Sequence, residues 1–444
     1  MHKWTPSTWE KCSYQQSASY SSPDELNAII SQIHALPPLV TSGEIKRLKK
    51  NIALAGRGEA FILQGGDCAE SFNDCRPDII SNKLKILLQM SLVLLHSMNK
   101  PIIRVGRIAG QYAKPRSSDV ETINGVTLPS YRGDLVNAQS FDAQSREPNP
   151  QLMLQGYHCA GVTLNFIRAL LNGGFADLNR PEQWDLRFVE HSPQAARYHR
   201  IVQSISKSLR FLDAIDGIRN SSINKVDFYT SHEALHLHYE QALTRQLKDG
   251  LYYDLSTHFP WIGMRTAYIG SAHLEFMRGI ENPIGLKVGP TATKEWLLEV
   301  LELLNPAREE GKILLITRLG DKHIGELLPP LIRAVQASKI PVTWSCDPMH
   351  GNTETTSDGV KTRHFDTILS ELKQALKIHQ RASSFLGGVH FELTGDNVTE
   401  CIGGARGLNE SHLKQAYHSL VDPRLNYEQS LEMALQLGHA FEMN

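Results

Sequence analysis

Residues 61–70, FILQGGDCAE, are typical of the end of a buried strand that runs into a polar turn. The apolar run FIL is followed by two glycines, which end a strand, and then by Asp67, Cys68 and Glu70. A thiol and two carboxylates directly after a strand belong either to an ordinary turn or to a site. The rest of the sequence decides between these two interpretations.

Short apolar runs of this kind recur along the chain, and helix-like patterns fill most of the intervals between them. Alternating strands and helices imply a parallel sheet. Eight such units predict an α/β fold, a (β/α)8 TIM barrel, whose chemistry lies at the C-terminal ends of its strands. Pro260 and its neighbouring glycines weaken the fourth run as a strand. The eight runs are 61–66, 101–107, 226–232, 259–264, 284–289, 313–318, 342–347 and 388–394.

A helical segment precedes the first strand. Ser22 and Pro23 combine a cap residue with a first-turn proline, and apolar residues then recur at helical spacing until Pro37. A second amphipathic helix follows before the first strand. We therefore expect an N-terminal helical extension over residues 1–57 and a catalytic barrel over residues 58–444.

The interval between the second and third runs is much longer than the others. Ile201, Ile205, Leu209 and Leu212 lie within it on one helical face. We therefore expect inserted helices at about residues 185–220, outside the barrel. Their apolar face must be buried against the barrel wall or against another subunit.

Composition limits the class of protein. With 41% hydrophobic and 21% charged residues among 444, the chain has enough apolar material for a large core. A net charge of -1 gives no basic field for nucleic acid. The six cysteines show no CxxC pairs, which argues against a disulfide scaffold and a zinc ribbon. The first residues lack an apolar signal region, and no uninterrupted apolar run is long enough to span a membrane, so we expect a cytoplasmic protein.

Basic side chains follow several of the predicted strands. Any one of them alone is more often a solvated surface charge. Six cations at the same pole of one barrel would repel one another, and a site that holds them should bind a strongly anionic ligand. Arginine suits carboxylate and phosphate through paired hydrogen bonds, and lysine adds a point charge. The six are Arg107, Lys114, Arg116, Arg265, Lys287 and Arg318.

A second set combines one soft ligand with three harder ones. A thiolate, an imidazole and two carboxylates together can hold a divalent transition metal. Their spacing matches no local metal motif, and a single buried cysteine or histidine is more often a packing residue. Their placement after separate strands favours a joint site. The four are Cys68, His350, Glu392 and Asp422.

Several longer motifs together are specific to one family. They are LQGGDCAESF, RIAGQYAKPRS, GLKVGP, WSCDPMHGNT, KTRHFD, HFELTGDNVTECIGG and DPRLN. On these motifs the chain resembles the type II 3-deoxy-D-arabino-heptulosonate 7-phosphate (DAHP) synthases, over roughly residues 40–430. The resemblance implies a (β/α)8 fold and a transferase that condenses phosphoenolpyruvate with D-erythrose 4-phosphate. That reaction gives DAHP and phosphate as the first step of the shikimate pathway, toward chorismate and the aromatic amino acids.

The resemblance also implies roles for single residues. Cys68, His350, Glu392 and Asp422 match the metal ligands. The phosphoenolpyruvate site is matched by Arg107, Arg265, Lys287 and Arg318, with Met264 beside them. The erythrose 4-phosphate site is matched by Lys114, Arg116 and Ser117. Arg107, Lys114, Lys287 and Arg318 are expected to be catalytic.

The chain departs from the family pattern at two places. Met264 stands before Arg265 where glutamate is expected. Asp321, Lys322 and His323 follow the sixth strand where Asn-His-Lys is more usual. Neither departure removes a metal ligand or a core cation. Both leave open which substrate the site is adapted to bind.

The resemblance further implies a divalent metal, manganese first, with cobalt, iron or zinc as alternatives. It also implies a homo-oligomer, allosteric feedback by aromatic amino acids and a chorismate mutase as a partner. Nucleic acid and membranes are not expected partners. Three alternatives stay open: a secondary-metabolism paralogue of the phenazine or amino-sugar type, another metal-dependent barrel aldolase or lyase, and a non-catalytic binding partner.

Overall fold

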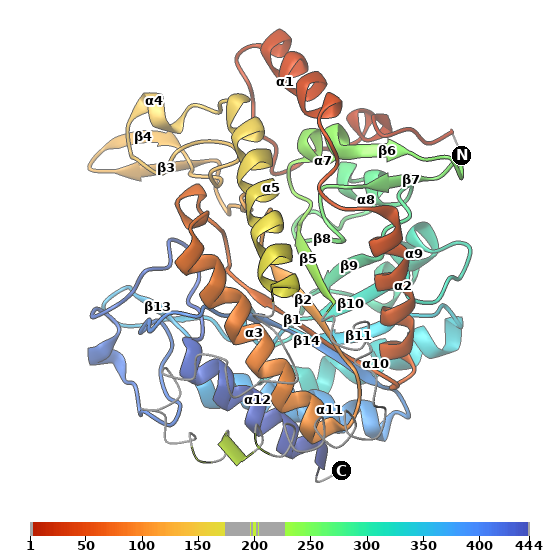
Figure 1. The fold of residues 1–444 in the computed structure, drawn as a ribbon, viewed down its shortest axis with the longest axis vertical. Coiled ribbons are helices and arrows are strands. Elements are labelled where there is room, and N and C mark those ends of the chain that lie inside the picture. The colour runs from red at the N-terminus through yellow and green to blue at the C-terminus, as the bar shows by residue number, and fades with distance from the viewer. Residues whose placement is uncertain (1–2, 174–195, 197–198, 201–202, 204–226, 443–444) are drawn as a thin grey trace.

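The computed structural model describes residues 3–173 and 227–442, together with the isolated positions 196, 199, 200 and 203 (Figure 1). The helices predicted at about 185–220, and the apolar positions on which they depend, therefore lie outside the described residues.

Eight parallel strands close into a barrel, and each of the eight predicted runs supplies one of them. The strands follow one another around the barrel in chain order, and the last pairs with the first, with Ile62 opposite Gly388. Pro260 lies within the fourth strand and is tolerated there. The (β/α)8 prediction is thus confirmed. The strands are β1 (Phe61–Gly66), β2 (Ile102–Arg107), β5 (Phe228–Glu233), β8 (Phe259–Ile262), β9 (Ile284–Val288), β10 (Ile313–Thr317), β11 (Thr343–Cys346) and β14 (Leu386–Glu392).

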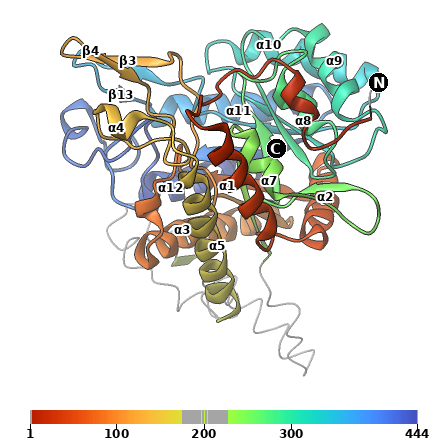
Figure 2. The same cartoon turned by 90° about the horizontal axis from the view of Figure 1, so that it is seen from above.

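Helices surround the barrel, and Figure 2 shows them from above. α3 (Pro77–Met98) is the one helix in the described ranges that is apolar and long enough to cross a membrane, but most of it is buried. It packs on α12 (Tyr427–Glu442), β1 and β2. It is therefore a core helix. The helices after β1 are α3 (Pro77–Met98), α4 (Ala143–Arg146), α5 (Gln151–Asn172), α7 (Leu237–Leu243), α8 (Ala272–Met277), α9 (Lys294–Leu304), α10 (Ile324–Ser338), α11 (Phe365–Arg381) and α12 (Tyr427–Glu442).

Short hairpins and turns decorate the loops. The hairpin of β3 and β4 projects from the barrel after β2 (Figure 1). The small strands are β3 (Val120–Ile123), β4 (Val126–Pro129), β6 (Thr244–Gln246), β7 (Tyr252–Asp254), β12 (Glu354–Thr355) and β13 (Lys361–Thr362), and the 3-10 turns are η1 (Thr8–Lys11), η2 (Phe72–Asp74) and η4 (Glu410–His412).

The N-terminal helices form where the cap signals predict them. In α1 (Pro23–Ala35) the Ser22 side chain accepts a hydrogen bond from the Glu25 backbone N–H. α2 (Ser42–Gly56) begins with a complete capping box between Thr41 and Glu44. The apolar face of α1 belongs to the same hydrophobic cluster as residues of α5 and α7 and contacts both helices. That face is therefore covered within the same chain.

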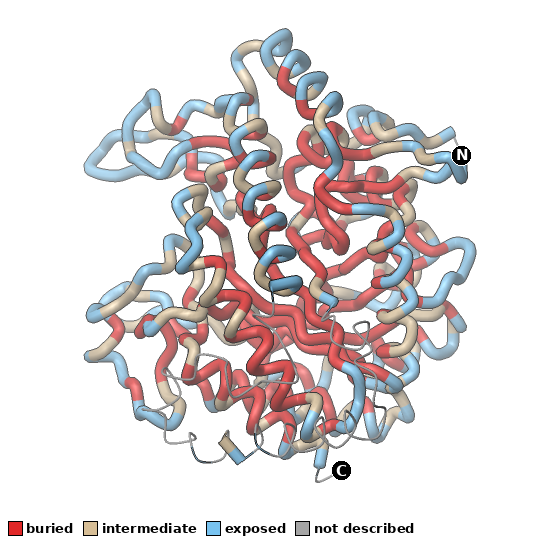
Figure 3. The backbone as a smooth tube through the Cα atoms, in the orientation of Figure 1, coloured by how far each residue is buried: buried red, intermediate tan, exposed pale blue. Residues whose placement is uncertain are grey.

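α2 closes the N-terminal pole of the barrel, where the eight strands begin. Leu48 and Ile52 of α2 join one hydrophobic cluster with Ile62 and Val105, which point into the barrel. The Thr343 hydroxyl, at the start of β11, donates a hydrogen bond to the Ile52 carbonyl (2.9 Å). Figure 3 shows the continuous buried band that the strands form. A division between extension and barrel after residue 57 stays a prediction, and α2 packs as part of the barrel core.

Candidate active site

Side chains from most of the strand ends line one cavity at the C-terminal pole, where the barrel strands end. Gly66, at the end of β1, has φ +148°, and a Cβ there would lie 2.5 Å from the Arg107 carbonyl oxygen. Glycine thus lets the chain approach β2 closely and turn Cys68 inward. The predicted residues that line this cavity are Cys68, Arg107, Lys114, Met264, Arg265, Lys287, Arg318, His350, Glu392 and Asp422.

Arg116 and Ser117 are not brought into this cavity. They line a neighbouring one, together with residues of the N-terminal segment such as Gln16. Arg116 is paired with Glu121, and its backbone N–H donates to the Gln16 side chain (2.7 Å). The KPRS stretch is therefore divided, because Lys114 faces the first cavity and the next residues face the second.

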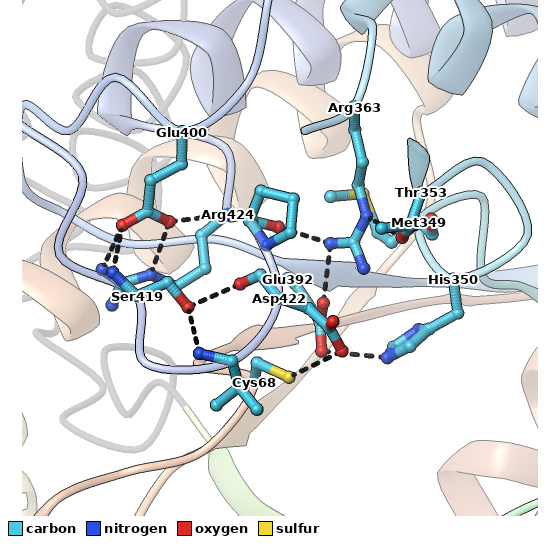
Figure 4. Close-up of polar contacts among 12 residues, drawn as sticks. Cys68, Met349, His350, Thr353, Arg363, Glu392, Glu400, Ser419, Asp422 and Arg424 are labelled. Carbon is cyan, nitrogen blue, oxygen red and sulfur yellow. Dashed lines mark hydrogen bonds and ion pairs between the residues drawn. The ribbon is translucent and has the colours of Figure 1, made fainter. Parts of the chain in front are cut away.

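The four predicted metal ligands do meet. One ligand atom from each of Cys68, His350, Glu392 and Asp422 lies within 4.8 Å of all the others (Figure 4). The Cys68 sulfur is 3.5 Å from Asp422 Oδ2, and His350 Nε2 is 3.0 Å from Glu392 Oε1. Such mutually facing donors fit a divalent transition metal between them.

Neighbouring side chains fix the direction of these ligands. Asp347 Oδ2 accepts a hydrogen bond from His350 Nδ1 (2.7 Å), which leaves Nε2 to face the other donors. A carboxylate behind a histidine in this way orients a metal ligand and raises its basicity. Arg363, fully buried, donates to Glu392 Oε2 (2.6 Å).

The buried cations govern the charge of Glu392. Burial alone would raise the pKa of this carboxyl group, but His350, Arg363 and Arg107 hold it well below its ordinary value of 4.5. Cys68 behaves in the opposite way: burial, with Glu392 nearby, raises its thiol pKa to about 12. Lys114 lies 3.0 Å from both the Cys68 sulfur and Asp422 Oδ2.

The cations of the cavity are held by fixed partners. Arg107 donates to His390 Nε2 (2.9 Å) and to Glu392, and it stacks over Trp261 at 5.3 Å. Arg318 donates to the His350 carbonyl oxygen (2.8 Å). These contacts aim the guanidinium groups into the cavity.

Lys287 forms an ion pair with Asp347 beneath the cavity. Burial lowers its pKa to about 8, against the opposing effect of Asp347, and Arg107 lowers it further. At neutral pH the protonated, positively charged form of this lysine still predominates.

A buried ion-pair network joins the two loops that carry Cys68 and Asp422. Arg424 donates to Asp67 (2.5 Å) and to Glu400 (2.8 Å), and Asp67 is also paired with Lys83 from α3. Figure 4 shows Arg424 and Glu400 beside the ligands. The network ties together loops that lie far apart in the sequence.

Sequence reasoning did not assign a role to four residues around the cavity. Asp347 and His390 lie at strand ends, and Arg363 lies within the KTRHFD motif. Their positions in the sequence were the only signal that they belong near the site. Glu233 is the last residue of β5, one position past the predicted run. The rule that site residues lie at the ends of barrel strands would have found Glu233 if the strand end had been placed one residue later.

Comparisons with known proteins agree with this geometry. A family model described as the class-II DAHP synthetase family matches residues 4–438. A phospho-2-dehydro-3-deoxyheptonate aldolase from Neurospora crassa is 46% identical, with 97% of this chain and 93% of the relative aligned. A protein of the same name from Streptomyces coelicolor is 45% identical, with 98% and 96% aligned.

A solved structure, a truncated 3-deoxy-D-arabino-heptulosonate 7-phosphate synthase from Thermotoga maritima, is 13% identical and has a TM-score of 0.32, with 85% of this chain and 84% of that chain covered. This likeness carries no weight beside the barrel's own strand order.

Proposed function

We propose how the residues of this chain divide the work of one reaction, from the premise that the chain belongs to the class-II DAHP synthetase family. It condenses phosphoenolpyruvate with D-erythrose 4-phosphate to DAHP and phosphate. The reaction is the first step of the shikimate pathway. One observation carries the proposal: four metal donors and five cations, all from separate parts of the chain, line the same cavity.

We place a divalent metal among Cys68, His350, Glu392 and Asp422, because the donors converge and the His350 imidazole is oriented from behind. When bound, the metal supplies a Lewis acid for the aldehyde oxygen of erythrose 4-phosphate. The mixture of one thiolate, one imidazole and two carboxylates favours manganese, cobalt, iron or zinc over calcium and magnesium. Manganese is our first candidate.

Arg107, Lys287 and Arg318 bind the carboxylate and phosphate of phosphoenolpyruvate, with Arg265 at the mouth of the cavity. Support comes from their position: the first two are buried, and all of them line the same cavity. Charged donors in a shielded site hold an anion and stabilise the charge that develops during reaction. Met264, beside Arg265, is half-exposed and contributes apolar surface there.

Lys114 lies next to the metal donors and is suited to orient the aldehyde of erythrose 4-phosphate. Arg116 and Ser117, which line the neighbouring cavity, bind the phosphate of this substrate from that side. An arrangement of two anion sites that flank one metal holds the two reacting carbons together, which removes much of the entropic barrier.

The test is an assay of the purified protein with both substrates. We expect phosphate release and consumption of phosphoenolpyruvate in equal amounts, only when erythrose 4-phosphate is present, and a product with the mass of DAHP. An amino-sugar phosphate offered in place of erythrose 4-phosphate tests the secondary-metabolism alternative. Carbon–carbon bond formation without phosphate release would indicate an ordinary aldolase and contradict the proposal.

The family also supports proposals that reach beyond the barrel: a cytoplasmic homo-oligomer, feedback by aromatic amino acids and a chorismate mutase partner. The segment at 190–217 is the candidate regulatory element, and its apolar positions give the physical motive. Light scattering, with titration of phenylalanine, tyrosine and tryptophan, compares wild type with a chain in which this segment is replaced by a short loop. Unchanged assembly and unchanged inhibition would refute the regulatory role.

A further inference from the structure

One glutamine of the N-terminal segment contacts the proposed phosphate site of erythrose 4-phosphate directly. Gln16 precedes α1 and lines the neighbouring cavity together with Arg116 and Ser117. Its side-chain amide bonds to the backbone of Arg116 at both ends. The amide oxygen Oε1 accepts from the Arg116 N–H (2.7 Å), and Nε2 donates to the Arg116 carbonyl oxygen (2.9 Å). The amide therefore pairs with this residue much as the backbone of a neighbouring strand would.

These two bonds are the only ones that the backbone of Arg116 makes with the described residues. Lys114, two positions earlier, is held differently, because its backbone N–H donates to the Arg132 carbonyl oxygen (2.9 Å). The guanidinium group of Arg116 forms an ion pair with Glu121. Gln16 thus fixes the main chain at Arg116, and Glu121 fixes the tip of the side chain.

The position of Gln16 is set by the barrel and not by the loop that it contacts. Two tyrosines flank it in the chain, and both are anchored to the loop that follows β5. The Tyr14 hydroxyl accepts a hydrogen bond from the Leu237 N–H (2.9 Å). The Tyr20 hydroxyl lies 2.6 Å from His236 Nε2. Because both flanks are anchored, Gln16 holds the loop after β2 from a fixed point.

The backbone of Gln16 supports a functional interpretation. Its φ is +64°, in the left-handed region that glycine and asparagine enter more readily than glutamine. Such a conformation persists only where its surroundings determine it, and it often marks a functional site. Arg132 contributes here, because its guanidinium group lies 3.5 Å from the Gln16 carbonyl oxygen. This unfavourable backbone conformation aims the amide at Arg116.

We propose that Gln16 is a positioning residue for the second substrate, which rests on the reaction and the phosphate site proposed above. It holds the backbone at Arg116 so that the guanidinium group and the Ser117 hydroxyl meet the phosphate of erythrose 4-phosphate. Arginine binds phosphate through paired hydrogen bonds, which depend on where the guanidinium group is held. Gln16 does not line the cavity of the metal donors and the phosphoenolpyruvate cations, so its effect should be confined to one of the two substrates.

The test is Gln16→Asn, which shortens the amide by one methylene group and suits the left-handed backbone. Both bonds to Arg116 are then lost. We expect the KM for erythrose 4-phosphate to rise about tenfold, since each neutral hydrogen bond contributes about two- to tenfold. The KM for phosphoenolpyruvate and the affinity for manganese should stay within about twofold of wild type, because a positioning effect on one substrate leaves the other unchanged.

The matched control is Gln15→Asn, the same change at the preceding position. The Gln15 side chain is exposed, and no hydrogen bond from it is seen within the described part of the chain. This variant should keep the wild-type KM for both substrates. Thermal unfolding of both variants, followed by circular dichroism, shows whether the N-terminal segment still folds onto the barrel.

A double-mutant cycle connects the effect to Arg116. Arg116→Ala should itself raise the KM for erythrose 4-phosphate. Addition of Gln16→Asn to that chain should then change this KM by less than about threefold, because the side chain that Gln16 positions is gone.

Three results would overturn the proposal. Gln16→Asn keeps the KM for erythrose 4-phosphate within about twofold, or it raises the KM for both substrates alike, or its effect is as large without the Arg116 side chain as with it. An unchanged KM for erythrose 4-phosphate in Arg116→Ala alone would overturn the phosphate site together with this proposal but leave the reaction standing. An inactive wild type would contradict the reaction, and this proposal with it.

Discussion

The two poles of the barrel each bury a lysine, and the contrast between the two lysines shows how the poles differ. Lys312 lies just before β10, at the N-terminal pole, and its ammonium group contacts the carbonyl oxygens of Ile280 and Asn282. Lys287 lies in β9 near the C-terminal pole, pairs with Asp347 and faces the cavity. Backbone carbonyls are fixed partners, whereas a side-chain pair is able to rearrange when an anionic substrate arrives.

The packing of the two poles follows the same division. α2 covers the N-terminal pole with an apolar face, and its Ile52 is almost fully buried. The C-terminal pole has no such covering helix among the described residues, and charged side chains line its cavity instead. We infer that one pole stabilises the fold and that the other carries the chemistry, as in other barrels of this type.

The largest effect should come from removing the cations of the C-terminal pole alone. Arg107→Ala, Lys287→Ala and Arg318→Ala should each lower kcat/KM for phosphoenolpyruvate by about tenfold to a hundredfold or more, since a desolvated charged hydrogen bond is worth roughly 1.5–3 kcal/mol. The triple variant should show no measurable turnover but keep its circular dichroism spectrum. Lys312→Met, which removes a buried charge at the other pole, is the control and should keep its turnover. Wild-type kinetics in the triple variant would contradict the site.

The reverse experiment changes the N-terminal pole. Ile52→Ala leaves a cavity between α2 and the barrel core, and we expect a loss of about 2–5 kcal/mol in the free energy of unfolding. Urea denaturation measures this loss, and kcat of the folded protein should stay at the wild-type value. Lys50→Ala, on the exposed side of the same helix, should change stability by less than about 0.5 kcal/mol. Equal effects of the two substitutions would show that α2 does not seal the barrel.

A smaller effect should follow from the residue that orients a metal ligand. Asp347→Asn weakens the hydrogen bond that directs His350, and we expect metal affinity to fall by about 10–100-fold. Competition with a fluorescent chelator measures this affinity without recourse to turnover. An unchanged affinity would mean that the imidazole is held by other contacts.

The smallest predicted effect concerns pH. Burial lowers the pKa of Lys312 to about 7 in the folded protein, with Lys49 adding to the shift and Glu281 and Glu309 opposing it. The unfolded chain keeps a value near 10.5, so between these two values it binds more protons than the folded state. The contribution of this residue to stability should therefore rise from pH 7 toward pH 10 and be lost as pH falls through 7. Lys312→Met should lack this slope in urea titrations across that range.

Much of this arrangement was predictable from the sequence because a barrel repeats one rule. Each apolar run marks a strand, and the active-site residues of a barrel lie at the C-terminal strand ends, so the sequence pattern placed Cys68 and Lys287 at the correct pole. The convergence of Cys68 with Asp422 depends on long-range folding, so their placement after separate strands only favoured a joint site, and the family resemblance supported it. The described geometry confirms it.

Other features required three dimensions. The separation of Arg116 from Lys114 into two cavities depends on a turn that no spacing rule describes. The role of α2 was missed because an amphipathic pattern shows which face is apolar but not what covers it. Glu233 was missed because a strand boundary was placed one residue early, which is within the usual error of such boundaries.

The central claim is that turnover depends on a metal held by the four converging donors, and one titration tests it most directly. Metal-stripped protein receives manganese in steps, and both bound metal and phosphate release from the two substrates are followed. We predict a rate that starts at zero and rises in proportion to bound metal until one ion per chain is present. Cys68→Ser should fail to reach that rate at the same manganese concentration, whereas Cys12→Ser, which does not line the cavity, should match wild type. Turnover in metal-free protein, or wild-type behaviour of Cys68→Ser, would contradict the account.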